Sequence, residues 1–212
     1  MTRFDMRSLM LRMIEIDFSN RHRHLPGSLS ALPIIASIYE TMKPDDVFIL
    51  SKGHSCAALY AVLEALGYHP DCSKVHPERD PANGVTITSG SLGHGLPIAV
   101  GIAYAKHLKD EPGTVHVLMG DGECQEGTTY ESLLQAARLE LQYRLVVHID
   151  GNGWQGSDAV LVDYLRPMRC LWPVRWHPTK KGHGIKRFEE DPQKSTHLLT
   201  EQDYRELVEE IG

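Results

Sequence analysis

Two stretches decide the fold: TVHVLMGDGECQEG at residues 114–127, and RLVVHIDGNG at residues 144–153. In each, a short apolar run ends in a glycine-rich turn that contains an aspartate. Short apolar runs bounded by such turns are typical of buried strands, and residues 128–141 between them have the apolar spacing of an amphipathic helix. Strand, helix and strand in this order predict a parallel pair, because parallel strands need a crossover connection.

The same alternation extends outward along the chain. A further buried strand is predicted at 47–50, and helices are predicted at 5–20, 28–44, 54–67, 95–107 and 200–211. For the helix at 28–44, Ser28 and Ser30 are candidate caps and Pro33 is placed in the first turn. The expected fold is an α/β domain over residues 1–212, with a parallel sheet flanked by helices on both faces. Residues 164–178 show no clear periodicity.

Composition excludes several classes of protein. Lys and Arg number 22 against 28 Asp and Glu, a net charge of −6, which is the wrong sign for binding a nucleic-acid backbone. The most apolar stretches are far shorter than a membrane-spanning helix requires. The N-terminal segment is interrupted by charged residues that a signal peptide would not tolerate. A cytoplasmic protein with no nucleic-acid or membrane partner is expected.

Polar residues directly follow two of the predicted strands. Asp121 lies in the turn after the strand ending at Met119, and Asn152 lies in the turn after the next strand. Because ligands of open α/β sheets bind beyond the carboxyl ends of the strands, both side chains are expected at one sheet edge. Carboxylate and amide oxygens suit Mg²⁺, whose shell is usually completed by phosphate oxygens. The pair predicts a bound diphosphate, although either turn alone could be only a tight connection.

These motifs resemble the N-terminal, thiamine diphosphate-binding half of the transketolase family. The signature is a GDG followed by about thirty residues and an Asn. The resemblance runs from Asn20 to Gly156, and the motifs that carry it occur in the family's order. They are HLPGSLS at 24–30, FILSKGH at 48–54, HPER at 76–79, TSGSLGHG at 88–95, GDGECQEG at 120–127 and DGNGWQG at 150–156.

The resemblance implies a role for each matching residue. The metal ligands would be Asp121, Asn152 and the backbone carbonyl of Trp154. The cofactor-binding positions would be His54, Gly90, Leu92, Gly120, Gly122 and Glu123, with a helix N-terminus as the alternative role for Glu123. The residues assigned to catalysis would be His24, His76, Glu126 and His197, with Glu126 at a subunit boundary. His22, His69, His107, His116 and His148 are interpreted as ordinary surface or core residues. His94 has two alternative roles, which are stabilising its loop and contacting the cofactor.

By this resemblance the motif-bearing core of the domain is 20–156 and the tail, 157–212, is shortened. The chain departs from the family pattern after Gly156. The segment TKKGHG at 179–184 follows Gly156 more closely than the corresponding segment does in the family. A helix-and-strand unit is therefore expected to be missing or much reduced. Val75 stands where a glycine is expected before His76. Because of the loose match in the tail, the substrate pocket is expected to differ from that of the pentose phosphate enzyme.

The resemblance also implies a partner. In the family, the carboxylate that activates the cofactor's aminopyrimidine belongs to a separate pyrimidine-binding domain. The chain is therefore expected to be one subunit of an α₂β₂ enzyme that uses thiamine diphosphate and Mg²⁺. It would transfer a two-carbon ketol unit from a ketose, a sugar or sugar phosphate, to an aldehyde acceptor. The alternatives are an acyl or ketol transferase subunit of a specialised pathway, and a non-catalytic subunit that keeps the fold.

Overall fold

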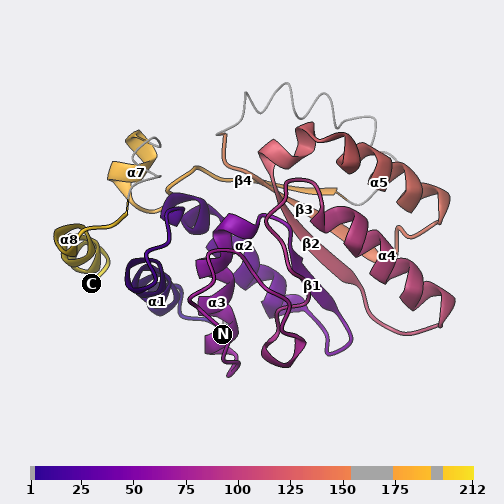
Figure 1. Ribbon diagram of the computed structural model, residues 1–212, viewed down its shortest axis with the longest axis horizontal. Helices are drawn as coiled ribbons and strands as arrows, with labels where there is room; N and C mark the ends of the chain where they lie inside the picture. Colours follow the sequence, from indigo (N-terminus) through magenta and orange to yellow (C-terminus); the bar gives the residue numbers. More distant parts are fainter. Residues whose placement is uncertain (1–2, 154–173, 192–197) are drawn as a thin grey trace. The chain divides into compact units, whose positions relative to one another are not determined.

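The predicted strands form one parallel sheet in the computed structural model, which describes residues 3–153, 174–191 and 198–212. The strand order is β1-β2-β3-β4, and every neighbouring pair is parallel (Figure 1). The α/β fold predicted from the sequence, a parallel sheet with flanking helices, is confirmed. The strands are β1 (Val47–Leu50), β2 (Val115–Gly120), β3 (Leu145–Gly151) and β4 (Val174–Pro178).

The chain divides into two compact units. The sheet unit comprises Met42–Lys52 and Ser89–Thr179, and the helical unit comprises Met1–Thr41, Gly53–Thr88 and Lys180–Gly212. Each unit is assembled from segments that are distant in sequence. One domain over residues 1–212 stays a prediction.

In the sheet unit, two helices accompany the strands. Helix α4 (Gly95–Leu108) contacts β1, β2 and β3, and helix α5 (Gly127–Arg138) lies alongside α4 (Figure 1). The central strands β2 and β3 are almost entirely buried, as continuous apolar runs in parallel sheets usually are. Burial of these strands fixes the turns that follow them, which carry the predicted metal ligands.

The expectation that a helix-and-strand unit is missing or much reduced is corrected for its strand, because β4 is present. Val174–Pro178 pairs in parallel with β3, so the strand of that unit is present. The sequence pattern missed it because Arg175, Trp176 and His177 do not form an apolar run. Residues 154–173, where the helix is expected to be missing or reduced, lie outside the described residues.

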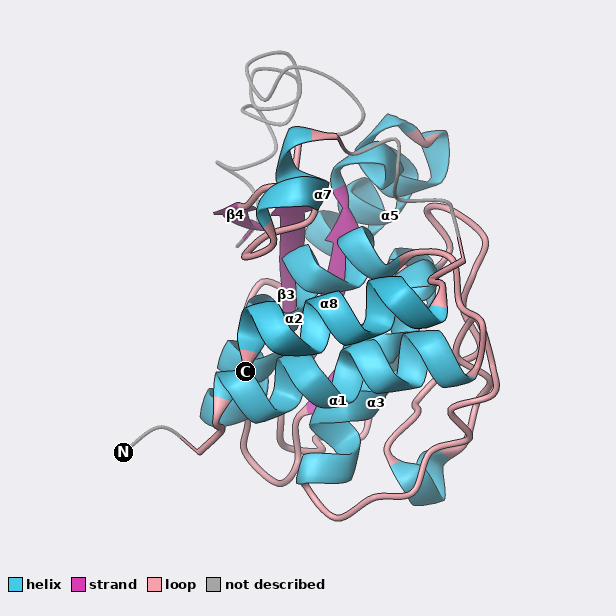
Figure 2. Cartoon of the chain, turned by 90° about the vertical axis from the view of Figure 1, so that its left-hand side faces the viewer, coloured by secondary structure: helices cyan, strands magenta, loops and turns pink. Residues whose placement is uncertain are grey.

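The helical unit is built around α1 (Met6–Ser19), which contacts α2 (Leu25–Thr41), α3 (Cys56–Ala65) and α8 (Glu201–Ile211). Figure 2 shows α1, α3 and α8 side by side. On the apolar face of α1, Leu9, Met13 and Ile14 are buried, whereas Met6 is exposed. No helix within the described ranges has the length and apolar character that crossing a membrane requires.

The start of α2 differs from the prediction. The helix begins at Leu25, so Ser28 and Ser30 lie inside it and do not cap it. Pro26 occupies the first turn, where a missing N–H costs nothing, and Pro33 lies in the interior. The Ser30 hydroxyl donates to the Gly27 carbonyl within the helix instead.

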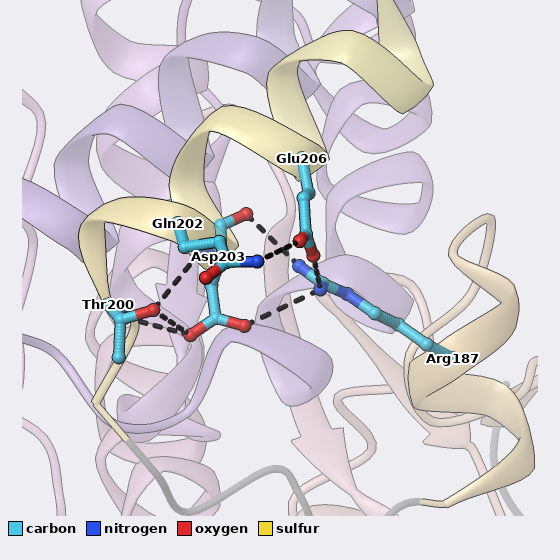
Figure 3. Close-up of polar contacts among 5 residues, drawn as sticks. All are labelled: Arg187, Thr200, Gln202, Asp203 and Glu206. Atoms are coloured by element: carbon cyan, nitrogen blue, oxygen red, sulfur yellow. Dashed lines mark hydrogen bonds and ion pairs between the residues drawn. The ribbon is translucent and has the colours of Figure 1, made fainter.

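Ion pairs and a hydrogen bond connect helix α8 to the short helix α7 (Lys186–Glu190). Arg187 reaches Asp203 at 3.5 Å and Glu206 at 3.0 Å, and donates a further bond to the Asp203 carbonyl (Figure 3). Thr200 and Asp203 form a capping box at the start of α8, where the sequence predicts a helix to begin.

Candidate functional site

The two predicted metal ligands follow neighbouring strands. Asp121 comes directly after β2 and is 4% exposed, and Asn152 comes directly after β3 and is 8% exposed. Gly120 and Asp150 are register partners, so the two turns begin at the same level of the sheet. The Gly122 N–H donates to Asp121 Oδ1 at 2.9 Å, which orients the carboxylate. Both oxygen-bearing side chains thus lie at the carboxyl edge of the sheet, as predicted from their positions after the strands.

A buried ion pair lies immediately before Asn152. Lys52 Nζ is 2.5 Å from Asp150 Oδ2, and neither side chain is more than 2% exposed. Asp150 also accepts bonds from the Thr179 hydroxyl and, at 3.5 Å, from the Asn152 amide nitrogen. The last bond turns the Asn152 amide oxygen away from Asp150, which leaves oxygen as the ligating atom that Asn152 would present to a cation.

Glu123 connects three segments of the sheet unit. Its carboxylate accepts bonds from the Ser51 hydroxyl, the Gly93 N–H at 3.0 Å and the Gly120 N–H at 2.8 Å. Burial raises the pKa of Glu123 despite these three donors. The contacts place Glu123 in the interior, where it fixes the turn at Gly120 relative to the glycine-rich loop at residues 90–95.

The glycine-rich loop before α4 depends on close packing. Gly93 has φ +73°, and a Cβ there would lie 2.5 Å from Thr128 Oγ1 and 2.8 Å from Glu126 Cβ. Only glycine fits this backbone and this space. Glu126, at the start of α5, is therefore packed against the loop, whereas Gly90 and Leu92 at the loop's start are exposed, Leu92 by 50%.

Within the helical unit, two of the three histidines predicted to contact cofactor or substrate, His24 and His54, lie against each other. The rings of His24 and His54 meet edge to face, with centroids 5.2 Å apart. Partial burial, and then the charge of His76, lower the pKa of His24. Gly27 makes room for His54, because a Cβ there would lie 3.1 Å from His54 Cδ2.

The donor atoms suit the expected metal. One carboxylate and one amide oxygen are hard ligands of the kind that Mg²⁺ prefers, and they leave coordination positions for phosphate oxygens. In the described part of the chain, no three side chains of His, Cys, Asp or Glu form a metal site of their own. Trp154 and His197, the remaining predicted ligand and catalytic residue, lie outside the described residues.

Sequence reasoning missed several members of the site. It assigns no role to Ser51, Lys52 and Thr179, and it includes Asp150 only as part of a motif. The available signal was position, since Ser51 and Lys52 follow β1 directly and Thr179 follows β4. Their partners could not be predicted, because the pairing depends on the register between strands that are far apart in sequence.

The comparisons with known proteins agree with this architecture. Residues 39–158 match the family described as "Transketolase, thiamine diphosphate binding domain". A chain with this sheet and this stretch of sequence belongs to that family.

Two relatives are named as subunits of transketolases. The apulose-4-phosphate transketolase subunit from Actinobacillus succinogenes is 34% identical over 71% of this chain and 60% of its own length. The 6-deoxy-6-sulfo-D-fructose transketolase subunit SqwG of a Clostridium species is 32% identical over 73% of this chain and 64% of its own. The chain thus spans less than two thirds of the length of these relatives.

Solved structures share the fold. Transketolase from Leishmania mexicana superposes with a TM-score of 0.62 over 97% of this chain and 44% of its own, at 21% identity. At that identity the likeness supports the fold alone.

Proposed function

We propose that the chain is the diphosphate- and Mg²⁺-binding subunit of a two-component, thiamine diphosphate-dependent transketolase-like enzyme. The enzyme transfers a two-carbon ketol unit from a ketose donor to an aldehyde acceptor. One observation carries the proposal: Asp121 and Asn152 present buried oxygen donors at the ends of adjacent strands, inside the segment that matches the family. Such a pair needs a diphosphate to complete a Mg²⁺ shell.

In this proposal each site residue has a specific task. The metal is held by Asp121, Asn152 and the carbonyl of Trp154. The cofactor is bound through His54, Gly90, Leu92, Gly120 and Gly122, and Glu123 acts from the interior by holding Gly93 and Gly120. Donor hydroxyls are oriented by His24, His76 and His197, and Glu126 lies towards the partner subunit. Bound thiamine diphosphate supplies the carbanion chemistry, while the protein binds and orients the reactants.

The partner and substrate follow from the same reasoning. Two relatives are named as transketolase subunits, which supports a second polypeptide that carries the pyrimidine-binding half. Their names specify sugars that bear a phosphate or a sulfonate, so an anionic sugar is the substrate class proposed. An α₂β₂ assembly and a cytoplasmic location are part of this proposal.

The test is cofactor binding by the chain in complex with its partner, measured by calorimetry with thiamine diphosphate and Mg²⁺. Asp121→Ala is expected to weaken Mg²⁺-dependent binding at least tenfold, because a carboxylate ligand is lost. Glu131→Ala, on the exposed side of α5, is the matched control and should bind like the unaltered chain. Equal cofactor affinity in Asp121→Ala and the control would exclude the metal-binding role.

Donor profiling of the same complex separates ketol transfer from the related acyl chemistry. A ketose donor should yield a shortened aldose without gas release. Release of CO₂ from a 2-oxo acid would instead identify an acyl transferase, and a complex inactive with every donor would favour a non-catalytic subunit.

A further inference from the structure

Three histidines on successive strands form a continuous line within the sheet unit. His116 Nδ1 of β2 is 3.1 Å from His148 Nε2 of β3, and His148 Nδ1 is 3.0 Å from His177 Nε2 of β4. The rings of His148 and His177 stack with centroids 5.2 Å apart. The line crosses three strands of a sheet whose other buried positions are mostly apolar.

The environment keeps these imidazoles neutral. His148 is 1% exposed, and burial, followed by the charges of His177, His116 and Arg175, lowers its pKa to about 3. Burial also lowers the pKa of His116 and of His177. Arg175 is the register partner of His148 and adds a positive charge beside it. A second proton on any ring would therefore be unfavourable at neutral pH.

Neutrality fixes the hydrogen arrangement. Three neutral imidazoles carry three N–H hydrogens, and two of them fill the two contacts within the line. The third hydrogen must lie at one end, so all three rings share one tautomer in either arrangement. At the first end, His116 Nε2 is 3.9 Å from Asp46 Oδ2, and Asp46 accepts backbone N–H bonds from Lys43 and Thr114.

The second end lies beside Asp150. His177 is the register partner of Asp150, and Thr179, two residues further along, donates its hydroxyl to the same carboxylate. Asp150 acts to raise the pKa of His177, as Asp46 does for His116, but the Asp150 carboxylate is paired with the Lys52 ammonium. The third hydrogen is therefore favoured at Asp46, which makes all three rings Nε2–H tautomers.

We propose that His116, His148 and His177 form a single-tautomer hydrogen-bonded chain that holds β4 against β3 and thereby positions Asp150 and Thr179 behind Asn152. His148, at the centre, is a positioning residue because it donates to one neighbour and accepts from the other. The consequence for Mg²⁺ binding rests on the proposed function. The arrangement of the histidines is argued from the sheet alone and does not depend on the proposed function.

The arrangement is tested by ¹⁵N NMR of histidine-labelled protein in complex with its partner, without cofactor. Nitrogen shifts should identify three neutral Nε2–H rings at pH 7.5. Mixed tautomers or a protonated ring among the three would overturn the proposal.

Substitution of the central histidine tests the positioning role. His148→Leu removes both contacts, whereas His148→Gln keeps a donor and an acceptor. In the leucine variant, exchange of the Thr179 amide, which donates to the Gly151 carbonyl, should accelerate about tenfold. The Val47 amide, which donates to the Thr114 carbonyl beside β1, should keep its rate. The glutamine variant should restore most of the protection, and His107→Leu, at an exposed ring of α4, is the control.

Cofactor titration completes the test. His148→Leu should raise the apparent Kd for Mg²⁺ about tenfold while kcat at saturating cofactor stays within about twofold, because the positioning acts on binding. Unchanged Thr179 exchange and unchanged Mg²⁺ affinity in His148→Leu would refute the proposal. If the unaltered complex binds no thiamine diphosphate, the proposed function fails, while the tautomer and exchange results still decide whether the histidine chain exists.

Discussion

At the scale of single residues, Asp17 in α1 places a carboxyl group in the interior. Its side chain is 2% exposed, Oδ2 has no hydrogen-bond partner among the described residues, and burial raises its pKa to about 7. An acid whose pKa is higher in the folded state contributes stability that is lost as pH rises from the unfolded pKa through the folded one. The contribution of Asp17 to the free energy of unfolding should therefore fall as the pH rises from about 4 to about 7.

Asp17→Asn removes the charge and keeps the shape. The variant should be more stable than the unaltered chain at pH 8, by about 2–4 kcal/mol, with a gain that shrinks towards pH 4. Urea unfolding across this pH range measures the difference. A gain of the same size at pH 4 and pH 8 would show that the ionised carboxylate is not its cause.

The Glu123 carboxylate offers a second prediction at this scale. Gly93 N–H and Gly120 N–H donate to different oxygens of Glu123, so Glu123→Gln leaves one of them facing an amide NH₂. We expect a loss of about 1–3 kcal/mol in the free energy of unfolding, since one buried donor becomes unsatisfied. Glu131→Gln on the exposed side of α5 is the control, and both are measured by denaturant unfolding. Equal stability of the two variants would contradict this interior role.

At the scale of elements, the capping box of α8 should hold the helix start. Thr200 accepts the Asp203 N–H at 3.1 Å, and Asp203 accepts the Thr200 N–H at 2.9 Å. Thr200→Ala should cost about 1 kcal/mol and increase amide exchange in the first turn of α8, whereas Thr200→Ser should cost little. If both variants exchange like the unaltered chain, the Thr200 side chain does not determine where α8 begins.

Most of the helices and strands could be predicted from the sequence. The strands at 47–50, 115–120 and 145–151 follow from their apolar runs, and Asp121 and Asn152 follow from their places after them. Strand β4 and the start of α2 were missed for physical reasons. The polar side chains of β4 have partners on β3 that the local sequence does not reveal. For α2, Pro26 indicates the beginning of the helix better than the two serines do. The interpretation of His116 and His148 as ordinary core residues agrees with their burial, but the sequence could not show the contacts that they make across strands.

At the scale of the whole molecule, the proposed function predicts dependence on a second chain. Mixing this chain with a partner that carries the pyrimidine-binding half should give ketol-transfer activity that saturates at equal amounts of the two. Light scattering on the eluted complex should give the mass of two copies of each, because one two-fold axis then relates two equivalent sites. The chain alone, at 23.8 kDa per copy, should bind cofactor weakly and turn over no donor. Full activity from this chain alone would overturn the two-component assignment, and saturation at another ratio would overturn the α₂β₂ stoichiometry.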